Sequence, residues 1–213
     1  MSRLKLTEIF YSLQGEADTA GIATTFIRLT GCPLRCQYCD TAYAFHGGEW
    51  WELPAILARV REHGAHHVCV TGGEPLAQKN CLELLQQLCT DAYRVSLETS
   101  GAMALGGIDP RVVLVVDVKT PDSGEEPRNR YEELARLTRK DLVKFVICSR
   151  ADYEWSVAKL RELALDSRCS VLFSPSHEEL PARDLADWVL QDRLPVRFQI
   201  QLHKYLWGNA RGK

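Results

Sequence analysis

Residues 30–41 read Thr-Gly-Cys-Pro-Leu-Arg-Cys-Gln-Tyr-Cys-Asp-Thr and follow an apolar, strand-like run at residues 25–29. Within this loop Cys32, Cys36 and Cys39 have the spacing C-x3-C-x2-C. The strand end fixes the base of the loop, and its glycine and proline favour a tight turn. The spacing therefore predicts that the three sulfurs converge on one point. Three thiolates on a short loop suit an iron–sulfur cluster whose fourth iron is left open.

Two other interpretations of the cysteine loop stay open at this point. The loop could bind zinc, with His46 as the fourth ligand, or its cysteines could be ordinary reduced thiols. The five remaining cysteines stand singly in apolar stretches, and we expect them to pack in the core as small hydrophobic residues. They are Cys69, Cys81, Cys89, Cys148 and Cys169.

A second motif, at residues 68–75, reads Val-Cys-Val-Thr-Gly-Gly-Glu-Pro. It predicts a strand that runs into two glycines and then into a helix start. Gly72 and Gly73 would let a ligand lie against bare backbone, and a helix start offers free N–H donors. Such turns are common, but this one follows the cysteine loop by about thirty residues. Together the two motifs resemble the radical S-adenosylmethionine (SAM) superfamily. In that superfamily three cysteines hold a [4Fe–4S] cluster and the Gly-Gly-Glu-Pro turn receives the methionyl amino group of SAM.

Composition indicates an ordinary globular protein. The chain has 213 residues, of which 46% are hydrophobic and 25% charged, with a net charge of −2. This length predicts a single domain over residues 1–213. The charge gives no reason to expect nucleic acid as a partner. We see neither an apolar run long enough for a membrane span nor a signal-peptide core, so we expect a cytoplasmic protein with reduced cysteines.

Hydrophobic patterning predicts alternating strands and helices from about residue 23 onward. Expected strands cover residues 4–13, 23–29, 66–71, 93–98, 112–118, 142–148, 170–173 and 196–201. Helices are expected from residue 53 to Gly64, around 82–89, over 152–165 and around 185–189. Alternation of this kind predicts right-handed crossovers and a parallel sheet. The chain is too short for eight β-α units, so we expect an α/β fold with mostly parallel strands, a partial (β/α)6-type barrel of about six strands.

Two segments are harder to interpret. Residues 42–51 are aromatic and glycine-rich, which is typical of a cap over a site or of a packed crossover. Residues 121–130 form the most polar stretch and predict an exposed excursion. Polar residues follow several strands, and parallel folds build their sites at the carboxyl ends of the strands.

Three further stretches narrow the resemblance. They are residues 11–17, Tyr-Ser-Leu-Gln-Gly-Glu-Ala; residues 39–41, Cys-Asp-Thr; and residues 203–207, His-Lys-Tyr-Leu-Trp. They resemble the 7-carboxy-7-deazaguanine synthases of the queuosine pathway over nearly the whole chain. Enzymes of that family are carbon–nitrogen lyases that contract 6-carboxy-5,6,7,8-tetrahydropterin to 7-carboxy-7-deazaguanine with loss of ammonia. The fold implied is a shortened radical SAM core.

The resemblance also implies roles for individual residues. Cys32, Cys36 and Cys39 would hold the cluster, where SAM is cleaved to a 5′-deoxyadenosyl radical that takes the substrate C6 hydrogen before SAM is re-formed. The implied substrate residues are Leu13, Gln14, Gly15, Glu16, Arg28, Thr71 and His203. The implied SAM residues are Tyr38, Cys39, Asp40, Gly73, Ser100, Asp117, Val118, Lys119 and Ser174. Many homologues have Ser-Pro-Lys where this chain has Asp117, Val118 and Lys119, which changes the backbone contacts expected there.

Chemistry supports some of these assignments. The Glu16 carboxylate can accept paired N–H bonds from the guanidine-like edge of a pterin. Arg28 has the fork geometry to meet the substrate carboxylate. Thr41 is the implied Mg²⁺ ligand, since this ion takes few protein ligands beside waters and substrate oxygens. Alone, Asp40-Thr41 would favour a helix or turn cap.

The family resemblance also implies partners, and two alternative functions stay open. The family implies an external, flavodoxin-like electron donor and a homodimer. The nearest alternative is an activating enzyme that makes a glycyl radical on a partner protein, which would need an open groove for a peptide loop. A zinc-binding interaction module that uses the three cysteines and His46 is the alternative from a different class.

Overall fold

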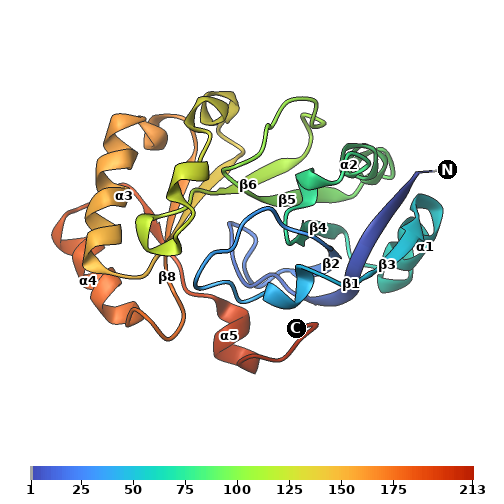
Figure 1. The fold of residues 1–213 in the computed structure, drawn as a ribbon, viewed down its shortest axis with the longest axis horizontal. Coiled ribbons are helices and arrows are strands. Elements are labelled where there is room, and N and C mark those ends of the chain that lie inside the picture. The colour runs from blue at the N-terminus through green and yellow to red at the C-terminus, as the bar shows by residue number, and fades with distance from the viewer. Residues whose placement is uncertain (1) are drawn as a thin grey trace.

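The computed structural model describes residues 2–213 and builds them around one nine-stranded sheet (Figure 1). The strands are β1 (Arg3–Leu13), β2 (Ala23–Leu29), β3 (Glu49–Glu52), β4 (His67–Gly72), β5 (Arg94–Ser100), β6 (Val113–Asp117), β7 (Leu142–Ile147), β8 (Ser170–Pro175) and β9 (Arg197–Phe198). The helices are α1 (Leu53–His63), α2 (Cys81–Thr90), α3 (Arg150–Glu162), α4 (Ala182–Gln191) and α5 (Leu202–Trp207). Most elements match the predicted ones within a few residues.

The sheet is mostly parallel and open. Its order is β3-β1-β2-β4-β5-β6-β7-β8-β9, and every pairing from β2 to β9 is parallel. Only β1 pairs antiparallel, with β2 on one side and β3 on the other. Because β3 and β9 lie at opposite edges, the barrel does not close. The predicted α/β class and partial barrel are therefore confirmed.

Helices bury the apolar faces that the sequence indicated. In α1, Leu53, Ile56, Leu57 and Val60 are buried, and Gly64 ends the helix with a φ of 68°, a left-handed conformation that suits glycine. Figure 1 shows α1 and α2 toward one end of the sheet and α3 and α4 toward the other. Their buried side chains join those of the central strands in one hydrophobic core that runs across the sheet.

The structure gives each of the two segments that were harder to interpret a definite place. Residues 42–51 contribute Tyr43 and Phe45 to the cavity lining and run into strand β3, which pairs with β1 and extends the sheet. The polar stretch at residues 121–130 forms two short 3-10 turns that contact the cysteine loop. There the Gln37 N–H donates to the Ser123 carbonyl, and the Arg35 N–H donates to the Glu125 carboxylate. The excursion therefore supports the cysteine loop.

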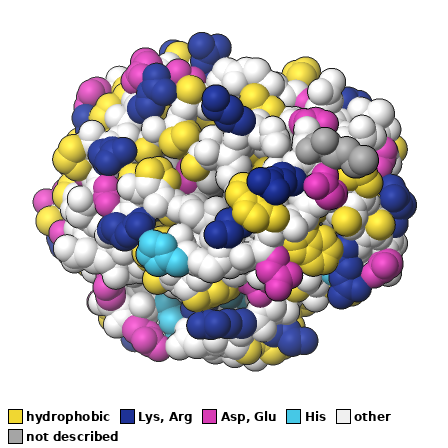
Figure 2. All heavy atoms as spheres, turned by 45° about the vertical axis from the view of Figure 1, so that its right-hand side comes forward, with side chains coloured by type: hydrophobic (Ala, Val, Ile, Leu, Met, Phe, Trp, Pro, Cys, Tyr) yellow, Lys and Arg dark blue, Asp and Glu magenta, His cyan; other side chains and the backbone are white. Residues whose placement is uncertain are grey.

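The C-terminal segment returns to the start of the chain. The predicted last strand is reduced to the two residues of β9, and α5 follows it. The Leu202 N–H donates to the Gly15 carbonyl at 3.0 Å, which ties α5 to the turn after β1. Within residues 2–213, no helix has the length and apolarity that crossing a membrane requires. Figure 2 shows basic and acidic side chains interspersed on one face, in keeping with the small net charge.

Candidate functional site

A cavity of about 560 Å³ lies at the carboxyl ends of the parallel strands. Its lining comes from the turn after β1, the cysteine loop, the glycine turn after β4, the ends of β5, β6 and β7, and the C-terminal segment. Every site residue predicted from the sequence lines this cavity except Val118 and Ser174. Residues far apart in the chain are thus brought to one place, as expected for a parallel sheet.

Val118 and Ser174 are buried and do not line the cavity. Val118 is buried in the hydrophobic core between Asp117 and Lys119, because successive residues of an extended chain point to opposite sides. The Ser174 hydroxyl donates to the Gln199 carbonyl at 3.0 Å and is buried. Ser176, beyond the end of β8, lines the cavity instead.

The wall formed by the cysteine loop and the turn at residues 72–74, here called the cluster wall, is held together by backbone contacts. The Gly73 N–H donates to the Leu29 carbonyl at 3.0 Å, and the Glu74 N–H donates to the Gly31 carbonyl at 2.7 Å. A Cβ on Gly73 would lie 2.2 Å from the Gly31 carbonyl oxygen. Gly73 is therefore required for the close approach of the cysteine loop, apart from any role in binding a ligand.

The cysteines fit a cluster better than a single ion. Among residues 2–213, no three His, Cys, Asp or Glu side chains are placed so that they could hold a single metal ion. In a [4Fe–4S] cluster each thiolate binds a different iron, so the sulfurs need only share one wall. All eight cysteines are free, and the Leu34 N–H donates to the Cys32 sulfur at 3.4 Å. His46 is exposed and lies outside the cavity lining, which argues against the zinc alternative.

Glu74 supports this wall from below, a role that the motif alone did not indicate. It is fully buried, and its carboxylate accepts bonds from the Leu76 N–H, the Thr99 hydroxyl and both the N–H and hydroxyl of Ser100 at 2.7–2.9 Å. Burial raises its pKa although these donors oppose the shift. Glu74 thereby fixes the end of β5, where Ser100 lines the cavity.

A second part of the cavity lining, here called the substrate wall, consists of Glu16, Arg28, Lys144 and Gln201. One Glu16 oxygen accepts from Lys144 Nζ at 2.5 Å, and the other accepts from Gln201 Nε2 at 2.8 Å. Burial opposes ionisation of Glu16, but the charge and hydrogen bond of Lys144, with Gln201 and His203, lower its pKa to about 2. Glu16 is therefore an anion inside the cavity.

Arg28 is oriented by residues of the first strands. Its Nε lies 2.8 Å from Glu8 Oε1, which also accepts from the Tyr43 hydroxyl at 2.7 Å. Its guanidinium lies over the rings of Phe10 and Tyr43, 5.6 and 5.9 Å from their centroids. The ion pair uses Nε, so the terminal amino groups remain to bind a carboxylate ligand.

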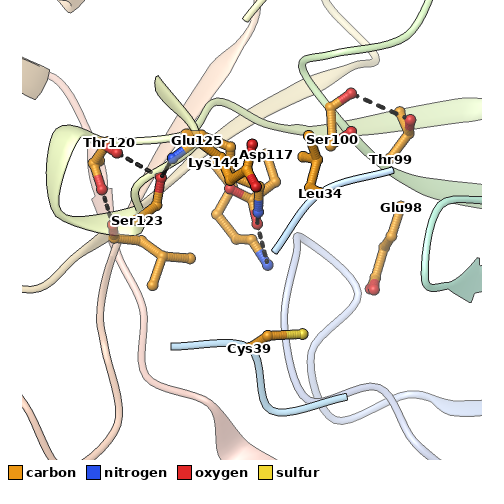
Figure 3. Close-up of polar contacts among 12 residues, drawn as sticks. Leu34, Cys39, Glu98, Thr99, Ser100, Asp117, Thr120, Ser123, Glu125 and Lys144 are labelled. Carbon is orange, nitrogen blue, oxygen red and sulfur yellow. Dashed lines mark hydrogen bonds and ion pairs between the residues drawn. The ribbon is translucent and has the colours of Figure 1, made fainter. Parts of the chain in front are cut away.

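Glu98 is a cavity residue to which the sequence assigned no role. At the end of β5, it accepts from the Thr71 hydroxyl at 3.0 Å and from Gln14 Nε2 at 3.4 Å. Figure 3 shows Glu98, Asp117, Lys144 and Cys39 around the same space. Its position directly before Thr99 and Ser100, at the end of a predicted strand, was the available signal.

The predicted SAM side contains a second buried ion pair. Lys119 Nζ lies 2.9 Å from Asp117 and 5.7 Å from the centroid of the Tyr38 ring. Lys144 Nζ lies 3.8 Å from the same Asp117 carboxylate, a contact drawn in Figure 3. Burial raises the pKa of the Cys36 thiol to about 11, while the Lys119 charge opposes the shift.

Thr41 and Asp40 lie beside the cluster wall. The Thr41 hydroxyl makes no capping hydrogen bond to the short helix that follows it, contrary to the simple turn-cap interpretation. It lies 3.8 Å from the Cys39 sulfur and lines the cavity. Asp40 lies 3.9 Å from Lys204 Nζ, which connects the cysteine loop to α5.

The last residues cover the cavity. A Cβ on Gly15 would lie 2.1 Å from His203 Nδ1, so the glycine lets the imidazole pack against the turn after β1. Residues 208–213 also line the cavity, with the Arg211 guanidinium 4.3 Å from the centroid of the Tyr43 ring. Burial lowers the pKa of His203, while Glu16 and Asp40 oppose the shift.

Comparisons with known proteins agree with this geometry. Residues 26–173 match the family model of the Radical SAM superfamily. The 7-carboxy-7-deazaguanine synthase of Chlorobaculum tepidum is 42% identical, with 98% of this chain and 97% of that protein covered. The synthase of Koribacter versatilis is 41% identical, with coverage of 96% and 97%. The crystal structure of QueE from Escherichia coli superposes with a TM-score of 0.78 at 25% identity, covering 94% of this chain and 95% of that one. The chain therefore belongs to the 7-carboxy-7-deazaguanine synthase family of the radical SAM superfamily.

Proposed function

We propose that this chain converts 6-carboxy-5,6,7,8-tetrahydropterin to 7-carboxy-7-deazaguanine with loss of ammonia. The observation that carries the proposal is the pairing of the two walls in one cavity. One wall presents three free cysteines, and the other presents a buried anion and an arginine. A carboxylated pterin has a complementary pair of groups, the N–H donors of its pyrimidine edge and its carboxylate.

The substrate wall recognises both ends of such a molecule. Each Glu16 oxygen accepts one protein donor and has a further lone pair, so the carboxylate can accept two parallel N–H bonds from the pterin. Arg28, held by Glu8, meets the carboxylate on the opposite end. Glu98, oriented by Gln14 and Thr71, provides further acceptor oxygens between them.

The cofactors of this superfamily fit the remaining residues. Cys32, Cys36 and Cys39 would hold the [4Fe–4S] cluster, and Tyr38, Asp40, Gly73, Ser100, Asp117 and Lys119 would surround SAM. Bound together, cluster and SAM supply the one-electron chemistry that removes a hydrogen atom from the substrate carbon. The protein's own residues orient that carbon, and α5 and residues 208–213 contribute to the lining of the cavity.

Thr41 would provide a ligand for Mg²⁺. Its hydroxyl lines the cavity without a capping role, and an oxygen donor beside substrate oxygens and waters suits this hard ion. Asp40, the neighbouring carboxylate, contributes negative charge near the same position. The role of Thr41 is therefore to add one neutral oxygen to a shell completed by substrate and water.

Partners follow from the chemistry. An external electron donor, of the flavodoxin type, must deliver the electron that the reaction needs. The free state of all eight cysteines supports a reducing compartment such as the cytoplasm. Homodimerisation stays a prediction of the family resemblance.

Mass spectrometry of an anaerobic reaction tests the proposal. Reconstituted protein, SAM, a reductant, Mg²⁺ and 6-carboxytetrahydropterin are mixed, and the products are followed over time. We expect 7-carboxy-7-deazaguanine to form without net consumption of SAM. Cleavage of SAM to 5′-deoxyadenosine without any deazapurine would contradict the assigned substrate while leaving the radical chemistry intact.

A further inference from the structure

Lys144 occupies an unusual position for a lysine. It is the third residue of β7, in a run of otherwise apolar residues, and its side chain is 11% exposed. Its ammonium lies against Glu16 of the substrate wall and 3.8 Å from Asp117 on the predicted SAM side. A buried lysine is retained only where its charge is paired. Here it is paired with a carboxylate that lines the cavity.

We propose that Lys144 is a positioning residue for substrate recognition, which holds the Glu16 carboxylate ionised and fixed so that it can accept paired N–H bonds from the pterin. The inference rests on the proposed function, because it assigns a role at that same site. The inference goes beyond the proposed function because it makes selectivity for the pterin edge depend on Lys144, which is 128 positions from Glu16 in the chain.

Geometry supports this role. Lys144 donates to one Glu16 oxygen and Gln201 to the other, so the plane of the carboxylate is fixed at two points. The same two donors leave one lone pair on each oxygen for a ligand. Rotation of the carboxylate would break at least one of these bonds. The pterin therefore meets a carboxylate that is already oriented.

The charged groups around Glu16 also support this role for Lys144. Besides Lys144, the groups that face Glu16 are His203 and Gln201 of the C-terminal segment. Lys144 itself also faces Asp117 of β6 and Glu98 of β5, which add negative charge to the same region. Burial lowers the pKa of His203, so the imidazole is a poor substitute for the ammonium near neutral pH. A Glu16 without Lys144 would therefore tend to protonate, and a protonated carboxyl accepts paired N–H bonds poorly.

A double-mutant cycle tests the inference. Wild type, Lys144→Met, Glu16→Gln and the double variant are compared in the anaerobic reaction, after their iron content has been matched. We expect Lys144→Met to lower kcat/KM for the pterin by about tenfold or more, mainly through KM. In the Glu16→Gln background the same change should add less than about twofold, because its effect passes through Glu16.

The pH profile separates this role from simple stabilisation. In Lys144→Met the pKa of Glu16 should rise, so kcat/KM should fall at a higher pH on the acid side than in wild type. Lys144→Arg, which retains the charge, should restore most of the wild-type profile. Lys140→Met is the matched control, since Lys140 pairs with buried Asp141 at 2.7 Å outside the cavity. It should lower Tm and leave KM unchanged.

Each outcome decides the proposal. The proposal would be overturned if the effects of Lys144→Met and Glu16→Gln on kcat/KM multiplied fully in the double variant. It would also be overturned if Lys144→Met left KM and the pH profile unchanged. If the single variant does not fold, the comparison of Glu16→Gln with the double variant still tests whether Lys144 acts through Glu16, because a further loss well above twofold there would overturn the proposal. A wild-type protein that makes no deazapurine would instead refute the proposed function, and binding of 7-carboxy-7-deazaguanine to the same variants would then be measured calorimetrically.

Discussion

The two walls of the cavity are built by different means. The cluster wall is a short stretch of chain fastened to the turn at residues 72–74 by backbone hydrogen bonds and a glycine contact. The substrate wall is assembled from side chains whose partners are far apart in sequence, such as Glu16 and Gln201, separated by 185 positions. One wall depends on local chain geometry, and the other depends on buried charge pairs.

Because of this difference, we expect the two walls to respond differently to substitutions. Backbone contacts in the cluster wall tolerate little change in shape, because a protein interior is close-packed. Ion pairs in the substrate wall tolerate changes in shape better than changes in charge, because an unpaired buried charge is costly. Substitutions in the first wall should therefore affect the cluster, and substitutions in the second should affect selectivity for the substrate.

Cys36→Ala should have the largest effect. It removes one of the three thiolates of the cluster wall, so the protein should lose both its cluster and its activity. Iron and sulfide analysis with the visible absorption spectrum measures the first, and product formation measures the second. Cys89→Ala, on α2 outside the cavity, is the control and should keep both. A brown and fully active Cys36→Ala protein would refute the assignment of the cluster wall.

Gly73→Ala should follow in size. The new Cβ would lie 2.2 Å from the Gly31 carbonyl oxygen, so the cysteine loop must move. Overpacking of this kind costs about 1–3 kcal/mol, and we expect poor cluster retention with little change in far-UV circular dichroism. Gly106→Ala has no atom within 4 Å of its new Cβ and serves as the control. Equal cluster content in the two variants would contradict the packing argument.

Glu8→Gln tests the part of the substrate wall formed by Arg28. The change weakens the ion pair that orients Arg28, whose side chain is only 14% exposed. We expect kcat/KM for the pterin to fall by about tenfold with normal cluster content. Glu62→Gln, which breaks an exposed pair with Arg59, should change neither quantity. An unchanged kcat/KM in Glu8→Gln would show that Arg28 needs no such support.

Thr41→Ala should have the smallest effect of the four. The cluster should stay intact, and activity should fall by about three- to tenfold, because water can replace a neutral oxygen in the shell of Mg²⁺. Titration of activity with Mg²⁺ should show a higher half-maximal concentration than in wild type. An unchanged Mg²⁺ dependence would remove Thr41 from the proposed ion site.

The sequence predicts the cluster wall better than the substrate wall for a physical reason. Cys32, Cys36, Cys39 and the paired glycines stand in contiguous motifs whose spacing has a chemical meaning on its own. The parallel strands were also predictable, because buried strands show as apolar runs. The short edge strand β3 was missed, since its four residues carry acids at both ends and alternate little.

Long-range pairing explains what was missed in the site. Lys144 reads as one polar residue within an apolar strand, and only the folded chain shows that Glu16 faces it. A lysine in a strand buried on both faces was itself a signal that a buried acid must lie nearby. Residues 208–213 offered no motif, and their place over the cavity follows from the course of α5.

Glu16→Gln in the anaerobic reaction tests most directly whether the two walls have separate roles, one in holding the cluster and the other in recognising the substrate. Cluster content, SAM cleavage by a strong reductant and deazapurine formation are measured on the same sample. The account predicts a normal cluster and continued cleavage of SAM to 5′-deoxyadenosine, with deazapurine formation reduced by about a hundredfold or more. Loss of the cluster, or deazapurine formation at the wild-type rate, would contradict it.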